Sequence, residues 1–238
     1  MKYAFSGRVR FSELGRGETL SLPNILNYFQ DCSTFQSEEL GVGLAYLEKQ
    51  RKAWVLYSWQ VEVKRYLSLG EELQVCTFAS DFSGMYGSRN FLMKDGTGVE
   101  VAKANSLWVY MDLVGKRPTR PQAREIALYG IEEPLDMENV SRKIVVPKEC
   151  EEKQPHFVRR DQIDTNHHVN NVQYVKMAME ELPLDYEVSK LRVEYKKAAV
   201  FGDTIVPRVA KHENEYIVAL SDGAGSLYAT VAFQGGIL

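Results

Sequence analysis

Apolar positions in two stretches of the chain recur with the spacing of an α-helix. After Ser21, a residue suited to an N-cap, apolar side chains return every three or four positions, and Pro23 stands where a first helical turn accepts proline. A second stretch begins at Asn170 or Asn171, repeats its apolar residues in the same way and ends at Pro183. The pattern therefore predicts two long helices.

Most of the remaining chain is rich in β-branched and aromatic residues, as strands are. Asp95-Gly96 and Asp222-Gly223 are dipeptides typical of tight hairpin turns. Residues 116–155 differ, because prolines and charges interrupt them, and we interpret them as a linker with a short helix near Gln122–Tyr129. The strand patterns lie at 53–67, 99–113, 191–201, 215–222 and 227–234.

The two halves of the chain repeat the same order of features. Phe11 and Tyr28 are as far apart as Phe157 and Tyr174, so the two helices superpose at an offset of 146 (174 − 28). Two later segments also superpose without gaps. They pair 61–71 with 193–203, at an offset of 132, and 94–104 with 221–231, at an offset of 127. Three matches in the same order indicate an internal duplication.

One helix per half, followed by a long antiparallel sheet, predicts an α+β fold in which each sheet wraps around its central helix, the hotdog arrangement. A single hotdog exposes a sheet edge that a second copy covers. We therefore predict a tandem (double) hotdog within one polypeptide. Its predicted parts are an N-terminal hotdog at 1–115, a linker at 116–155 and a C-terminal hotdog at 156–238.

Composition narrows the classes of function. The 238 residues include 45% hydrophobic and 26% charged residues, as in soluble globular proteins. A net charge of −3 gives no basic field for nucleic acid. No apolar run suits a signal peptide or approaches the ~20 residues of a membrane span. Cys32, Cys76 and Cys150 lack metal-binding or disulfide spacing, which predicts reduced thiols in a cytoplasmic protein.

The segment DQIDTNHHVNNVQYV (161–175) places polar residues directly before the second helix. In an extended segment, Asp164, Asn166 and His168 would point to one side and His167 to the other. The amides and the positive end of the following helix favour an oxyanion. The simpler interpretation is an asparagine-rich cap with two solvated histidines.

Three segments together resemble the acyl-ACP thioesterases, a double-hotdog family of plastids and bacteria. Residues 54–75 are similar to its first-half strand pair, and AKANSLWVYMDLVGKRP (102–118) is similar to its A-x-S-x-W-V-x-M signature. DTNHHVNNVQYV (164–175) resembles its active-site motif. The resemblance implies hydrolysis of fatty acyl–acyl carrier protein to free fatty acid, with acyl carrier protein as partner and with neither metal nor cofactor.

Thioester hydrolysis needs a polarised carbonyl, a positioned water and a proton acceptor. His168 suits the role of base, because the unperturbed pKa of a histidine is ~6.5. Asn166 would orient water or the carbonyl, and Asp164 would fix the tautomer of His168 or orient Asn166. A metal site is disfavoured because His167 and His168 would diverge on a strand. A cysteine nucleophile is disfavoured because Ala199 occupies the family's cysteine position.

The chain departs from the family pattern at one position. The family places a glutamate, assigned to the attacking water, where this chain has Ala198. Glu194 is a poor substitute, since four residues along a strand place it on the same face but roughly 13 Å away. At the offset of 146, Glu18, Leu20 and Leu22 match the three catalytic candidates, which predicts one competent site per chain, in the C-terminal hotdog, with the N-terminal hotdog holding the acyl chain.

Basic pairs could steer an acidic carrier protein, although such pairs are more often ordinary solvated surface. Two further functions stay open: a thioesterase acting on acyl-CoA or another thioester, and a catalytically impaired acyl-binding hotdog protein. Acyl chain length and saturation are not readable from the residues, and a homodimer stays open as the assembly. The candidate docking residues are Arg159, Arg160, Lys196 and Lys197, with Lys116 and Arg117 as a further basic pair.

Overall fold

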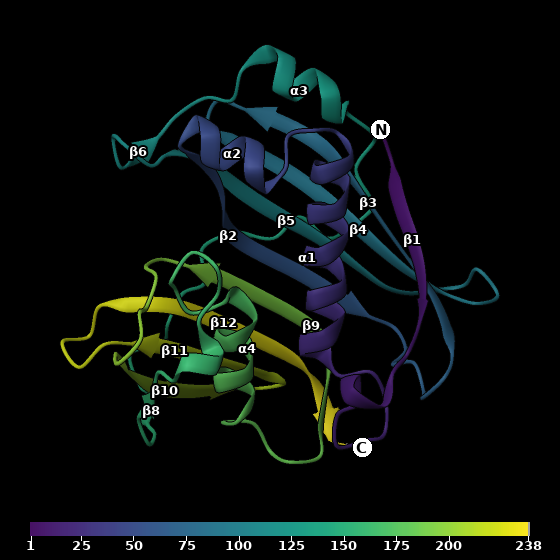
Figure 1. Ribbon diagram of the computed structural model, residues 1–238. Helices are drawn as coiled ribbons and strands as arrows, with labels where there is room; N and C mark the ends of the chain where they lie inside the picture. The colour runs from purple at the N-terminus through teal and green to yellow at the C-terminus, as the bar shows by residue number, and fades with distance from the viewer. Residues whose placement is uncertain (238) are drawn as a thin grey trace. The chain divides into compact units, whose positions relative to one another are not determined.

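The computed structural model describes residues 1–237 and divides the chain into two compact units (Figure 1). The first unit comprises Met1–Tyr57 and Val61–Glu138, and the second comprises Ser58–Gln60 and Asn139–Leu238. The main division, between Glu138 and Asn139, falls inside the segment interpreted as a linker, and the short stretch Ser58–Gln60 is the exception. Over the described range, none of the helices combines the length and apolar character that a membrane crossing requires.

The first unit is an antiparallel sheet with one long helix, α1 (Leu22–Glu39), against it. Ser21 is its N-cap, as predicted, and its buried face includes Phe29, whose ring centroid lies 5.3 Å from that of Phe91 in the sheet. The sheet order is β1-β3-β4-β5-β2, and β6 pairs with β5. The strands are β1 (Tyr3–Arg8), β2 (Lys52–Val63), β3 (Glu72–Ser83), β4 (Tyr86–Asp95), β5 (Glu100–Asp112) and β6 (Arg117–Pro118).

The second unit repeats this plan with α4 (Asn171–Met179). The helix ends at Met179, four residues before Pro183. Beyond Glu180 the hydrogen bonds span three residues instead of four, as the bond from the Leu182 amide to the Met179 carbonyl shows, which tightens the last turn. The sheet order is β9-β12-β11-β10-β7, and β8 pairs with β10. The strands are β7 (Glu151–Glu152), β8 (His156–Phe157), β9 (Tyr186–Tyr195), β10 (Thr204–His212), β11 (Glu215–Ser221) and β12 (Leu227–Ile237).

Short helical segments complete the chain: α2 (Leu44–Gln50), α3 (Ala123–Tyr129) and the 3₁₀ turns η1 (Phe11–Glu13) and η2 (Arg160–Gln162). α3 is the short helix predicted within the linker. The sequence did not reveal α2, and the reason is physical: it has only seven residues, none of them buried, which is too short a stretch to show a repeating apolar period.

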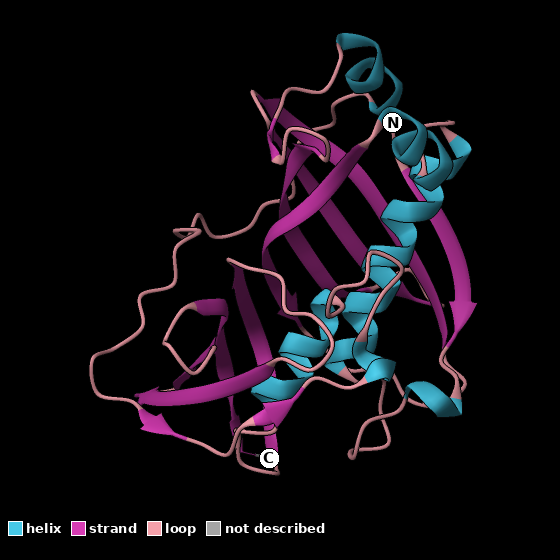
Figure 2. Ribbon diagram, turned by 60° about the vertical axis from the view of Figure 1, so that its left-hand side comes forward, coloured by secondary structure: helices cyan, strands magenta, loops and turns pink. Residues whose placement is uncertain are grey.

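Each unit is thus a hotdog, and the tandem α+β prediction is confirmed. Figure 2 shows each long helix lying against strands of its own unit. The apolar stripes found in the sequence are the buried faces of these helices. Those faces comprise Leu22, Ile25, Leu26, Phe29 and Cys32 on α1 and Val172, Tyr174, Val175, Met177 and Ala178 on α4.

The hairpins confirm the later repeat offset. The amide of Asp95 donates to the carbonyl of Val99, and the amide of Asp222 donates to the carbonyl of Ser226, both at 2.9 Å. Each of these aspartates also accepts backbone amides through its own side chain. Residues 127 positions apart therefore form equivalent hydrogen bonds in the two units, as the offset of 127 predicted.

The helices follow a different offset from the one predicted. α1 begins at Leu22 and α4 at Asn171, so their starts are 149 positions apart (171 − 22). The helix superposition at 146 is therefore wrong by three residues. The error is understandable, because a shift of three keeps a residue near the same face of a helix.

Candidate active site

The polar segment before α4 folds into a tight turn. The Asp164 amide donates to the His168 carbonyl at 2.8 Å, and the His167 amide donates to the Asp164 carbonyl at 3.0 Å. His167 has a φ of 62°, in the left-handed region. A bridge between Ile163 and Val169 closes the base of the turn. The prediction that this segment is extended, with alternate side chains on opposite sides, is therefore wrong.

The Asp164 side chain organises this turn from within. Its Oδ1 atom accepts hydrogen bonds from the amides of Asn166, at 2.8 Å, and His168, at 3.3 Å. Bonds of this kind from aspartate to the following backbone stabilise turns. One carboxylate oxygen is committed to the backbone in this way. The turn brings the three predicted catalytic residues together, with Asp164 bonded to both of the others.

The side chains of Asn166 and His168 are exposed, and Asp164 is half-buried. Within residues 1–237, neither the carboxamide of Asn166 nor the imidazole of His168 bonds to another residue. Their polar atoms are therefore available to a bound molecule. Hydrogen bonds fix the backbone of the turn, while the side chains of Asn166 and His168 form none with the rest of the described chain.

The N-terminus of α4 lies directly behind the turn. Asn170 caps the helix, because its Oδ1 atom accepts from the Val172 amide at 2.9 Å and its carbonyl accepts from the Gln173 amide at 2.9 Å. The Asn171 amide, at the first helical position, has no partner in the described part of the chain. One amide at the positive end of the helix is therefore left to face a developing negative charge.

The segment after β9 lies against the turn. The Ala199 carbonyl accepts from the Val169 amide at 2.9 Å, and the Ala199 amide donates to the Tyr174 hydroxyl at 2.7 Å. Ala198 is therefore next to the polar turn, and its methyl group is exposed. A longer side chain at this position would have room.

Glu194 cannot take the place of a carboxylate at Ala198. It is only 1% exposed, and its Oε2 atom accepts from the Ile144 amide at 3.1 Å. The next residue, Tyr195, faces the helix, since its hydroxyl donates to the Asn171 carbonyl at 3.0 Å. Neighbouring strand residues point to opposite faces, so Glu194 points away from α4. The expectation that it shares a face with Ala198 is wrong, because β9 ends at Tyr195.

The four candidate docking residues differ in their surroundings. Lys196 pairs with the buried Glu194, and Lys197 pairs with Asp222 at 3.2 Å. By contrast, neither Arg159 nor Arg160 forms an ion pair anywhere in residues 1–237, and both are exposed. These two arginines, which precede the polar turn in the chain, therefore carry charge without an acidic partner, while the lysines are partly neutralised.

A turn of the same form occurs in the first unit. The Gly15 amide donates to the Thr19 carbonyl at 2.8 Å, the Glu18 amide donates to the Gly15 carbonyl at 3.1 Å, and Glu18 has a φ of 56°. Leu20 and Leu22 lie beyond this turn in the buried core, so matching them to catalytic positions is wrong. The counterparts of Asp164, Asn166 and His168 are, in order, Gly15, Gly17 and Thr19.

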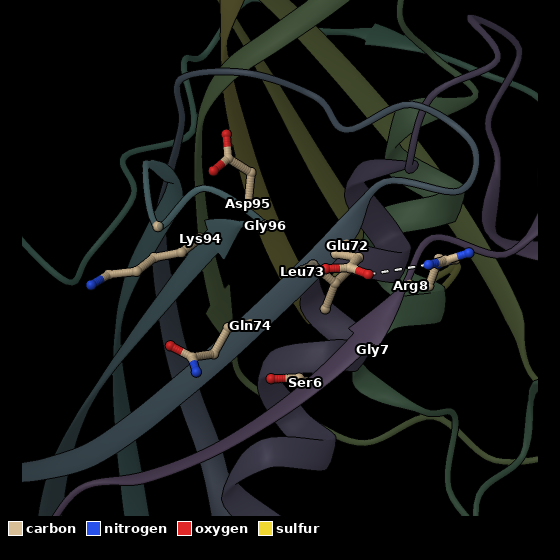
Figure 3. Close-up of a pocket in the computed structure, with 10 residues that line it drawn as sticks. Ser6, Gly7, Arg8, Glu72, Leu73, Gln74, Lys94, Asp95 and Gly96 are labelled. Carbon is tan, nitrogen blue, oxygen red and sulfur yellow. Dashed lines mark hydrogen bonds and ion pairs between the residues drawn. The ribbon is translucent and has the colours of Figure 1, made fainter.

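These counterparts carry no carboxylate, carboxamide or imidazole, so only the second-unit turn has all three groups. Within residues 1–237, the polar turn included, no cluster of three or more His, Cys, Asp or Glu side chains could hold a metal. A surface groove of about 490 Å³ lies between β1, β3 and the β4–β5 hairpin of the first unit (Figure 3). Its ion pair, Arg8 with Glu72, is exposed on both sides, and such pairs contribute little.

Changing His167 to glycine tests whether this histidine serves only the backbone. We expect the free energy of unfolding to rise by about 0.5 kcal/mol, because relief of left-handed strain, roughly 1–2 kcal/mol, exceeds the entropy that glycine loses, roughly 0.5–1 kcal/mol. We expect kcat to stay within about twofold, since proton transfer is assigned to His168. Thermal unfolding and turnover measure the two effects. Glu18→Gly is the matched control in the first unit, and a loss of kcat in His167→Gly alone would give this imidazole a role.

Models of one protein family match both halves of the chain. The model for the acyl-ACP thioesterase N-terminal domain matches residues 1–128, and the model for the acyl-ACP thioesterase C-terminal domain matches residues 146–232. Together they cover most of the sequence, including the polar turn.

Curated proteins and solved structures agree with these matches. A chloroplastic palmitoyl-acyl carrier protein thioesterase from Cuphea hookeriana is 28% identical over 210 residues, 79% of this chain and 50% of that protein. Oleoyl-acyl carrier protein thioesterase 2, chloroplastic, from Arabidopsis thaliana is 26% identical over 241 residues, 92% of this chain and 65% of that protein. The chain thus spans between half and two thirds of the length of these relatives.

Two solved structures share the fold over nearly their whole length. An acyl-ACP thioesterase from Bacteroides thetaiotaomicron has a TM-score of 0.91 at 20% identity and covers 99% of this chain and 98% of its own. The 12:0-ACP thioesterase from Umbellularia californica has a TM-score of 0.86 at 19% identity, covering 100% and 98%. At these identities the likeness establishes the fold.

Proposed function

Because the chain belongs to the acyl-ACP thioesterase family, we propose that it hydrolyses the thioester between a fatty acyl chain and acyl carrier protein and releases the free fatty acid. The observation that carries the proposal is the turn at 164–168. Its carboxylate fixes the backbone, and its carboxamide and imidazole stay free beside an unpaired helix amide.

The proposed reaction divides the work among these groups. His168 accepts a proton from a water molecule, whose oxygen adds to the thioester carbonyl carbon. The carbonyl oxygen takes up negative charge, which the Asn171 amide stabilises, while the Asn166 carboxamide orients the water. When the carbon–sulfur bond breaks, the thiolate leaves and receives the proton from His168. This reaction uses no metal and no cofactor.

Comparing an acyl-ACP with an acyl-CoA of the same chain length tests the proposal. We expect kcat/KM to be at least about 10-fold higher for acyl-ACP, because complementary charge raises the rate of encounter with a protein partner. Preference for acyl-CoA would make the chain a thioesterase of a different substrate class. Turnover of neither substrate would make it an acyl-binding hotdog protein.

Arg159 and Arg160 are the residues that we propose to meet the carrier protein. Both carry unpaired positive charge, and the Arg160 guanidinium lies 5.6 Å from the ring centroid of Phe201, which is 58% exposed. Phe157, 68% exposed, is on β8, two residues before Arg159. A surface that joins two cations to exposed aromatic rings suits an acidic protein with some apolar contact area. We expect Lys196 and Lys197 to contribute less to docking of the carrier protein, because each already has an acidic partner.

Reversing both arginines to glutamate tests this assignment. We expect KM for acyl-ACP to rise by about 10-fold at low salt, with little change for a short acyl-CoA, because steering depends on charge. The effect should shrink at physiological ionic strength, where the Debye length is about 8 Å. The control is the same reversal at Arg120 and Arg124, which are exposed in the first unit. Equal effects on both substrates, or from both variants, would remove these arginines from docking.

Compartment and assembly complete the proposal. All three cysteines are free, and reduced thiols are the usual state in the cytoplasm, where we propose that the protein acts. A homodimer stays a prediction, and the mass in solution measured by light scattering would test it.

A further inference from the structure

The structure assigns a positioning role to Tyr174, whose hydroxyl holds the Ala199 peptide in place beside the polar turn. The inference rests on the proposed function, since the turn is the proposed active site. Tyr174 is itself 2% exposed and does not reach the surface. It acts through Ala199 and is therefore not a catalytic residue.

The Ala199 peptide is held from both sides. Its amide donates to the Tyr174 hydroxyl at 2.7 Å, and its carbonyl accepts from the Val169 amide at 2.9 Å. Val169 follows His168 directly, so the position of Ala199 sets where the C-terminal arm of the turn lies. A chain of two hydrogen bonds thus runs from a buried hydroxyl on α4 to the residue next to His168.

The first unit provides a comparison within the same chain. At the offset of 149, the residue that corresponds to Tyr174 is Ile25, which has no hydroxyl. The backbone bond that corresponds to Val169–Ala199 is nevertheless present, from the Leu20 amide to the Leu67 carbonyl at 2.7 Å. The hotdog fold therefore forms this bond without a hydroxyl beneath it.

The hydroxyl occurs in the unit whose turn carries the three polar groups and is missing from the unit whose turn lacks them. Folding alone does not explain this difference, because both units make the same backbone bond. The difference is explained if catalysis requires the turn of the second unit to be positioned more accurately than the turn of the first unit. Displacing a reacting group by about 1 Å can cost about 10²-fold in rate.

The hydroxyl stays protonated at working pH. Burial raises the pKa of Tyr174 to about 12, so it does not ionise in the range where a thioesterase is assayed. A positioning role therefore predicts that removing the hydroxyl lowers kcat by the same factor across the pH profile. A role in proton transfer would instead change the shape of the profile.

Tyr174→Phe removes the hydroxyl and keeps the ring. We expect kcat for acyl-ACP to fall by about 10- to 100-fold, with KM within about twofold and an unchanged pH profile. Hydrogen exchange at the Val169 and Ala199 amides should become faster, because their shared anchor is lost. The control is Tyr186→Phe, which removes a hydroxyl that donates to the Asn214 carbonyl at 3.0 Å, and we expect it to leave kcat unchanged.

The outcomes separate this inference from the proposed function. If the unmodified protein turns over acyl-ACP and Tyr174→Phe matches it in kcat, the positioning role is wrong while the function stands. If the unmodified protein turns over no thioester, the proposed function fails, yet faster exchange at the two amides would still show that the hydroxyl holds the turn. Unchanged exchange would overturn the inference in either case.

Discussion

Replacing His168 by alanine, and separately Asn166 by alanine, should lower kcat by about 10²- to 10⁴-fold, the usual contribution of a group that transfers a proton or orients a reactant. Both side chains are exposed and without partners in the described chain, so their removal leaves no buried group unsatisfied. The turn itself should persist, because its bonds come from the backbone and from Asp164.

Steady-state kinetics and thermal unfolding of these variants should therefore give separate answers. We expect the melting temperature to stay close to that of the unmodified protein while kcat falls. Thr165→Ala is the matched control, since it truncates an exposed side chain of the same turn. If Thr165→Ala loses as much activity as His168→Ala, the assignment of a base to His168 is wrong.

The second large effect concerns the two carboxylate positions. Asp164→Asn keeps an oxygen for the Asn166 and His168 amides and removes the charge, so the turn should form while kcat falls by about 10²-fold. Asp164→Ala removes both and should lower the melting temperature as well. The difference between these two variants separates the electrostatic role of Asp164 from its structural role.

Ala198→Glu should raise kcat by about 10²-fold, because it supplies the carboxylate that the family pattern places beside the turn. Since Ala198 is exposed, the added charge stays in contact with water, and the cost of burying a charge is avoided. Ala198→Gln is the control of equal size without charge. Should Asp164→Asn retain full activity while a stably folded Ala198→Glu gains none, neither carboxylate position would matter and the mechanism would be wrong.

Local patterns in the sequence were enough to predict much of the architecture. Helical spacing predicted both long helices, and two Asp-Gly pairs predicted the β4–β5 and β11–β12 hairpins. The repeated order of these features predicted a tandem hotdog. Such features depend on neighbours a few residues apart, and the sequence displays those neighbours directly. The sequence also named Asp164, Asn166 and His168 as candidates, but it expected them on one side of an extended segment, which the turn contradicts, and their catalytic roles stay predictions.

Contacts between distant residues decided what the patterns could not. The turn at 164–168 was expected to be extended, although aspartate and asparagine are common in turns, and the bridge from Ile163 to Val169 and the internal bonds of Asp164 bend it. The opposite orientation of Glu194 became clear only with its bond to Ile144, 50 residues away. Among the four candidate docking residues, Lys196 and Lys197 have acidic partners and Arg159 and Arg160 have none within residues 1–237, which also depends on such contacts.

The sequence by itself determined which groups this protein carries: a duplicated hotdog, one polar segment before the second helix and an alanine where the family resemblance implies an acid. The tertiary structure alone decided how those groups are held. The bonds from Val169 to Ala199 and from Ala199 to Tyr174 join segments 30 and 25 residues apart, and a periodic pattern contains no information about such pairs. Hydrogen bonds form only where folding brings donor and acceptor within about 3 Å, so their partners are fixed by the packed fold.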